Sequence, residues 1–306
     1  MSSGQCQTGL YSSVGVEGKY CCNRGECNIT TDGIFTIFAG LFGLCIGSFL
    51  NVVSWRVPLG KSIVSPPSAC PGCGKEIEAR DNVPVLSYIL LLGKCRNCKM
   101  RISIRYPVTE LVTGALFLLA AYQTGCSFQF ITYAIFISLM VVVVRTDLEQ
   151  FIVLDEVSIG GTAAGLGLSL VPGGMGIMNS LYGAAGGFLF FLLIRLGASV
   201  YLRKNDIRTR APEGFEEEED EFQGGMGWGD VKLAACIGAF LGPAYTVMAF
   251  FAAFITGAST GIALMVLRKR EKRVPIPFGP FMALGALLAL FYGEQLWRGY
   301  LNFITM

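Results

Sequence analysis

Long apolar stretches alternate with polar segments along the 306 residues of this chain. A helix that crosses a lipid bilayer needs about 20 largely apolar residues. Such stretches are too long and too numerous here for the core of a soluble protein. We place eight of them at 34–54, 107–123, 127–145, 156–171, 178–202, 229–242, 244–267 and 276–296. The pattern predicts an all-α, polytopic membrane protein with about eight transmembrane helices.

The polar segments divide the chain into four predicted parts. Residues 1–33 form an extracytoplasmic tail, 34–54 the first transmembrane helix, 55–106 a cytoplasmic loop domain and 107–306 a transmembrane bundle. We expect no cleavable signal peptide, because the first apolar run begins only at Ile34. A loop domain of about fifty residues is too small for a robust apolar core, so a structural metal would help it to fold.

The positive charges indicate which way the helices cross the membrane. Nine Lys or Arg residues fall in 55–106, four in 203–210 and five in 268–273. The opposite side carries only Lys19, Arg24 and Arg298. Loops rich in Lys and Arg stay on the cytoplasmic side of a membrane. We therefore expect both termini outside and the long loops inside.

Two other polar segments carry weaker signals. The acidic run at 216–221 is typical of a solvated, flexible loop. In the N-terminal tail, four cysteines permit one or two disulfides whose pairing the sequence leaves open: Cys6, Cys21, Cys22 and Cys27.

The basic loop contains two C-x-x-C pairs, Cys70 with Cys73 and Cys95 with Cys98. Each pair places two thiolates on one ion, and two pairs complete a tetrahedral site. The reducing cytosol favours zinc over disulfides, and redox chemistry usually needs a single pair. Four sulfur ligands leave no open coordination position, so the spacing predicts a structural zinc rather than a catalytic one.

Asp147 and Asp230 stand at the edges of apolar runs, both on the predicted cytoplasmic side. An ionisable side chain at a membrane boundary is costly unless it has a partner or a function. The chain has no histidine, which excludes Ser-His-Asp and Cys-His nucleophile systems and metal proteases with imidazole ligands. Two carboxyls that share a site hold one proton between them and supply an acid and a base for hydrolysis.

Asp230 has a glycine-rich setting, Gly225-Met226-Gly227-Trp228-Gly229-Asp230-Val231-Lys232. Glycine lets backbone approach closely, and we expect Gly227, Gly229 and Lys232 to support the active site.

The second carboxyl is less uniquely marked. Four acidic residues follow the third apolar run: Asp147, Glu149, Asp155 and Glu156. Asp147 is closest to the membrane edge, so we choose it. The alternative is that Asp147 pairs with Arg145 or Lys232 as a boundary charge.

The order of several motifs resembles the type IV prepilin peptidase family, also called type IV leader peptidase/N-methyltransferase. These are Gly47-Ser48-Phe49-Leu50-Asn51-Val52 with Arg56 and Pro58, Asp81-Asn82-Val83-Pro84-Val85-Leu86-Ser87-Tyr88 between the C-x-x-C pairs, Arg105-Tyr106-Pro107 with Glu110-Leu111, Asp147, Asp230 and Pro277-Phe278-Gly279-Pro280. One departure is Leu154-Asp155, where the family often has Pro-Asp.

The resemblance implies that Asp147 and Asp230 are the catalytic residues of a membrane aspartyl peptidase in the bacterial inner membrane. It implies prepilin or pseudopilin substrates, cleaved after a glycine at the cytoplasmic face. It also implies S-adenosylmethionine as a cofactor for methylation of the new N-terminus. We expect the lipid bilayer as a further partner, and no nucleic acid.

Two other classes of function remain open from the residues alone. One is an ion- or proton-coupled transporter with Asp147 and Asp230 as ion sites. Such a protein should have polar residues near the midplane of several helices, whereas these runs are apolar between their ends. The other is a zinc-bearing scaffold of a secretion system, which leaves the glycine-flanked Asp230 unexplained.

Overall fold

The computed structural model describes residues 29–204, 226–268 and 277–304. The regular elements in these ranges are all helices. The long ones are α1 (Ile29–Arg56), α3 (Arg105–Thr124), α4 (Phe128–Gln150), α5 (Asp155–Ser169), α6 (Ile177–Lys204), α8 (Trp228–Arg268) and α9 (Gly279–Ile304). Three short ones, η1 (Val57–Leu59), η2 (Ala79–Asp81) and α2 (Leu86–Leu90), belong to the loop between α1 and α3. The tail cysteines and the acidic run at 216–221 lie outside the described residues.

Four of the described helices are long and apolar enough to cross a membrane: Gly33–Leu59, Phe128–Gln150, Ile177–Tyr201 and Trp228–Leu267. The expected all-helical, multi-pass architecture is therefore present. The count of eight transmembrane helices stays a prediction, because α3, α5 and α9 do not meet the same criterion of length and apolarity. The predicted runs 229–242 and 244–267 both belong to α8.

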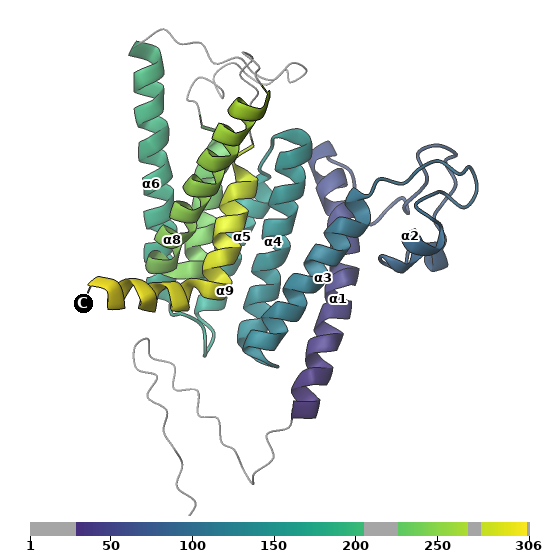
Figure 1. The fold of residues 1–306 in the computed structure, drawn as a ribbon, viewed down its shortest axis with the longest axis horizontal. Coiled ribbons are helices and arrows are strands. Elements are labelled where there is room, and N and C mark those ends of the chain that lie inside the picture. Colours follow the sequence, from purple (N-terminus) through teal and green to yellow (C-terminus); the bar gives the residue numbers. More distant parts are fainter. Residues whose placement is uncertain (1–28, 205–225, 269–276, 305–306) are drawn as a thin grey trace, which may run out of the picture.

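α8 reverses its direction at Gly242, where the backbone leaves helical geometry with φ 69° and ψ 174°. Pro243 follows, and proline removes one backbone hydrogen bond from a helix. The two arms then lie side by side, since both Ala234 and Phe250 approach Gly187 of α6. The break between the two predicted runs coincides with this reversal. Both ends of α8 consequently lie at the same end of the bundle (Figure 1).

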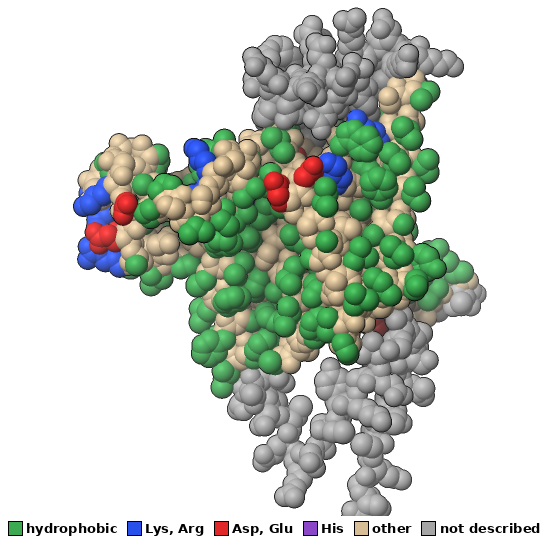
Figure 2. Space-filling model, turned by 180° about the vertical axis from the view of Figure 1, so that it is seen from behind, with side chains coloured by type: hydrophobic (Ala, Val, Ile, Leu, Met, Phe, Trp, Pro, Cys, Tyr) green, Lys and Arg blue, Asp and Glu red, His purple; other side chains and the backbone are tan. Residues whose placement is uncertain are grey.

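α4 stands in the middle of the bundle (Figure 1). On one side it contacts α1 and α3, which pack along each other. On the other side it contacts α5 and α9, and these pack with α6 and the arms of α8. The end of α4, both ends of α8 and the loop 57–104 share one end of the molecule. Apolar side chains cover most of the lateral face in Figure 2, as a lipid-facing surface requires.

α6 and α8 approach each other at the backbone level. A Cβ atom at Gly183 would clash with the carbonyl oxygen of Gly238, and one at Gly238 would clash with the carbonyl oxygen of Gly183. Membrane helices pack through small residues because lipid tails supply no hydrophobic force between helices. This contact fixes the first arm of α8 against α6.

We predict that Gly183→Ala destabilises the protein by about 1–3 kcal/mol, because the added methyl group overpacks a backbone contact. The matched control is Gly186→Ala on the same helix, where a Cβ atom meets nothing within 4 Å. Thermal unfolding of both variants in lipid nanodiscs measures the difference. Equal melting temperatures would contradict the close α6–α8 contact.

Candidate active site

Asp147 lies in the last turn of α4 and is buried, with 5% of its surface exposed. The backbone N–H of Gly279, at the start of α9, donates a hydrogen bond to Asp147 Oδ2 at 2.7 Å. A Cβ atom at position 279 would lie 2.6 Å from the same oxygen, so only glycine permits this contact. The partial positive charge at the N-terminus of α9 also favours negative charge on Asp147.

Asp230 lies in the first turn of α8 and is partly buried. The backbone of Gly227 lies close to its carboxyl group, and the negative charge of Asp147 acts on it electrostatically. Gly229 packs on Val153, just after α4, where a Cβ atom at 229 would lie 2.8 Å from Val153 Cβ. The start of α8 is thereby held against the end of α4. The structure thus brings the two predicted carboxyls into one site.

Arg195 of α6 was not among the predicted site residues. It is buried, with 8% of its surface exposed, and its Nη1 donates a hydrogen bond to the carbonyl oxygen of Met226. Its guanidinium carbon lies 4.6 Å from the ring centroid of Trp228, and its charge acts on Asp230. Arg195 therefore holds the glycine-rich segment from both sides of Gly227. The sequence signal for it is a lone cation inside the apolar run 178–202.

The ion pairs of the neighbouring charges do not involve the two aspartates. Arg145 pairs with Glu149 at 2.8 Å, and Lys232 Nζ contacts both oxygens of Asp155 at 2.7 and 2.8 Å. The alternative in which Asp147 pairs with Arg145 or Lys232 is therefore not observed. Lys232 joins the start of α5 to α8, which gives Asp155 a partner of its own.

The loop between α1 and α3 brings four cysteines together. The Sγ atoms of Cys70, Cys73, Cys95 and Cys98 all lie within 4.8 Å of one another. Around a tetrahedral zinc ion, sulfurs at about 2.3 Å from the metal are roughly 3.8 Å apart. Cys70 Sγ and Cys98 Sγ are 3.6 Å apart. The four thiols fit zinc, and no other His, Cys, Asp or Glu among the described residues joins the group.

Polar contacts stabilise the loop between α1 and α3 internally and connect it to the helical bundle. Arg96 donates two hydrogen bonds to the Asp81 carboxylate at 2.7 and 2.6 Å, and these lower the pKa of Asp81. Glu110 of α3 accepts a hydrogen bond from the backbone N–H of Val85 at 2.7 Å. Val85 has φ 60°, a costly conformation for a β-branched residue. The Glu110 carboxylate thus secures a strained turn at the edge of the bundle.

We predict that Cys95→Ser removes most of the bound zinc and destabilises the loop, because metal binding and folding are coupled in so small a unit. Cys126→Ser is the control, since Cys126 is exposed and lies outside the four-cysteine group. Elemental analysis of protein purified without chelator gives the metal content. A full equivalent of zinc in Cys95→Ser would exclude Cys95 as a ligand.

The sequence matches two family models in turn. Residues 41–124 match the bacterial peptidase A24 N-terminal domain, and residues 134–262 match the type IV leader peptidase family. The first range contains the last part of α1, the four-cysteine loop and α3. The second contains Asp147 and Asp230. No solved structure was found to match the chain.

Several relatives carry the name prepilin leader peptidase/N-methyltransferase. The Bacillus subtilis protein is 34% identical over 262 residues, which cover 86% of this chain and 96% of the relative. The Pseudomonas aeruginosa protein is 32% identical over 297 residues, covering 88% and 94%. The Aeromonas hydrophila protein is 30% identical over 289 residues, covering 86% and 93%. The chain therefore belongs to the type IV leader peptidase family.

Proposed function

We propose that this protein is a membrane aspartic endopeptidase that removes the leader of prepilins or pseudopilins and then methylates the new N-terminus. The observation that carries the proposal is the meeting of Asp147 and Asp230 at one end of the bundle. The relatives named prepilin leader peptidase/N-methyltransferase support the substrate class and the second activity.

The two carboxyls share one proton in this mechanism. The charged member takes a proton from a water molecule as the water oxygen attacks the peptide carbonyl carbon. The other member gives its proton to the carbonyl oxygen, and the resulting tetrahedral intermediate collapses with release of a protonated amine. Gly279 N–H and Arg195 keep negative charge in the site stabilised throughout.

We place the site at the cytoplasmic face of the bacterial inner membrane, with cleavage after a glycine. The two aspartates lie at the end of the bundle that carries the loop 57–104. Nine Lys or Arg residues in 55–106 favour the cytoplasm for that end. A leader on a prepilin that is still in the cytoplasm reaches the carboxyls there without crossing the bilayer.

Methylation needs a methyl donor, and we propose S-adenosylmethionine, whose sulfonium supplies an electrophilic methyl group when it is bound. Bound S-adenosylmethionine would supply this methyl group to the uncharged N-terminal amine, which would then lose a proton to water. A zinc ion held by the four cysteines would be structural, because four sulfur ligands would leave no open coordination position.

We predict that Asp147→Asn and Asp230→Asn each lower leader cleavage by about 10²–10⁴-fold, because an amide cannot exchange the shared proton. The double variant should lose little more than either single one, since residues that act as a unit are not additive. Asp155→Asn is the control and should show a milder loss, because it disturbs only the pair with Lys232. Purified protein with a peptide carrying a basic leader and a Gly-Phe junction, followed by mass analysis, gives the rates.

Substantial cleavage by either single aspartate variant would remove that residue from the dyad. The circular dichroism spectrum of each variant checks that the helices are retained.

We predict that Arg195→Gln lowers kcat for cleavage by about tenfold while KM changes little. Without Arg195 the carboxyl group of Asp230 is displaced, which weakens the stabilisation of the transition state rather than the binding of the substrate. Arg298→Gln is the control, an arginine of α9 paired with Glu294 in an exposed contact. Steady-state kinetics on the leader peptide separates the two parameters. A rise in KM with unchanged kcat would assign Arg195 to substrate binding instead.

A further inference from the structure

The last turn of α4 carries charged side chains on two opposite faces. Arg145 and Glu149 are four residues apart, so they share one face and pair at 2.8 Å. Asp147 is two residues from each, and two residues turn an α-helix by roughly 200°. Asp147 faces α9 through Gly279, whereas Glu149 also contacts Arg105 of α3 at 3.4 Å. A second polar site therefore lies across α4 from the two aspartates.

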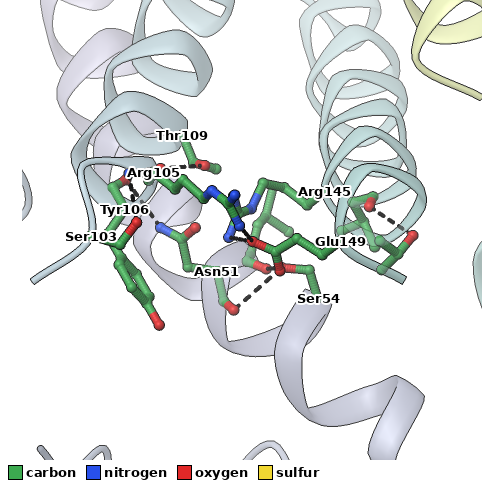
Figure 3. Close-up of polar contacts among 11 residues, drawn as sticks. Asn51, Ser54, Ser103, Arg105, Tyr106, Thr109, Arg145 and Glu149 are labelled. Atoms are coloured by element: carbon green, nitrogen blue, oxygen red, sulfur yellow. Dashed lines mark hydrogen bonds and ion pairs between the residues drawn. The ribbon is translucent and has the colours of Figure 1, made fainter. Parts of the chain in front are cut away.

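Figure 3 shows this second site between the ends of α1, α3 and α4. The side chain of Arg145 extends from α4 toward α1 and α3. Asn51 of α1 donates from Nδ2 to the carbonyl oxygen of Tyr106 at 3.2 Å, which fixes the orientation of its amide. Two guanidinium groups share the single carboxylate of Glu149 here. Glu110, one turn along α3 from Tyr106, is already bonded to the backbone of Val85.

Two buried polar atoms at this site have no partner. They are Asn51 Oδ1, an acceptor, and Arg145 Nε, a donor. Asn51 has only 4% of its surface exposed, so water does not readily replace the missing bond. No other buried side-chain nitrogen or oxygen in the described part of the chain lacks a partner. A buried donor or acceptor left unpaired is costly, and such an atom calls for a ligand.

The pair of free atoms defines the chemistry of that ligand. It must present an acceptor to Arg145 Nε–H and a donor to Asn51 Oδ1. A carboxylate beside an ammonium group, the end of an α-amino acid, provides both. The two arginines around one carboxylate favour a ligand carboxylate and oppose the basic leader of the peptide substrate.

We propose that Asn51 and Arg145 bind the amino-acid end of S-adenosylmethionine. This inference rests on the proposed methylation and assigns its cofactor to residues of this chain. Hydrolysis and methyl transfer then take place on opposite faces of α4, whose diameter with side chains is about 10 Å. The N-terminal amine exists only after hydrolysis, so cleavage precedes methylation, and the new N-terminus then passes from the aspartates around the end of α4 to reach the methyl group.

The test is calorimetric titration of S-adenosylmethionine into the full-length protein in lipid nanodiscs. Arg145→Lys keeps the charge but removes the Nε donor, and Asn51→Leu removes the acceptor. We expect each to weaken binding by about ten- to a hundredfold, the effect of one lost hydrogen bond to a charged group. Ser54→Ala is the control, because the Ser54 hydroxyl, although buried beside them, bonds only the α1 carbonyl oxygens of Leu50 and Asn51. It should bind as the unchanged protein does.

A second probe, 5′-methylthioadenosine, has no amino-acid end. We expect the Arg145→Lys variant to bind this probe as the unchanged protein does, which also shows that the variant is folded. Equal affinity of all variants for S-adenosylmethionine would overturn the assignment, as would an equal loss for both probes. If the unchanged protein cleaves the leader but does not bind S-adenosylmethionine, the proposed methyl donor is wrong instead.

Discussion

A carboxylate inside a membrane bundle needs hydrogen-bond donors from the protein, because lipid provides none. At Asp147 the donor is the backbone N–H of Gly279, and it reaches the carboxylate only because glycine has no Cβ atom. The start of α9 must therefore lie directly against the end of α4, so that Gly279 reaches Asp147. Gly229 likewise packs closely on Val153 because it has no Cβ atom, and this contact brings the start of α8 to the end of α4. The position of the two carboxyls follows from these contacts between helix ends.

The reversal of α8 at Gly242 also helps to position the two carboxyls. A straight helix of its length would carry its second half far from the site, whereas the reversal returns the chain toward α9. Phe254 of the second arm then packs against Phe278 with ring centroids 5.5 Å apart, immediately before Gly279. The aromatic contacts thus support the backbone that holds Asp147. Arg195 adds the remaining constraint from α6, because its hydrogen bond and its contact with Trp228 hold the segment before Asp230.

α4 divides the molecule into two parts that correspond to the two family matches. The part on the α1 and α3 side contains the four-cysteine loop and falls largely within residues 41–124. The part on the other side contains the arms of α8 and falls largely within residues 134–262. α1 and α3 pack along each other, so the loop joins the ends of two paired helices rather than standing as a free domain. A protein that cleaves and then methylates one N-terminus benefits from two such parts around one shared helix.

The sequence by itself determined the all-helical membrane class, the group of four cysteines and the choice of Asp147 and Asp230. Each depends on a local signal, namely runs of apolar residues, C-x-x-C spacing, or a carboxylate that stands beside glycines or at the edge of an apolar run. The role of Arg195, the bond from Gly279, the pairing of Lys232 with Asp155 and the free atoms of Asn51 and Arg145 were decided only by the tertiary structure. Each joins segments tens of residues or more apart in the chain. The break between the predicted runs at Gly242 marked a turn, but which segments meet across it depends on helix packing, which leaves no local pattern in the sequence.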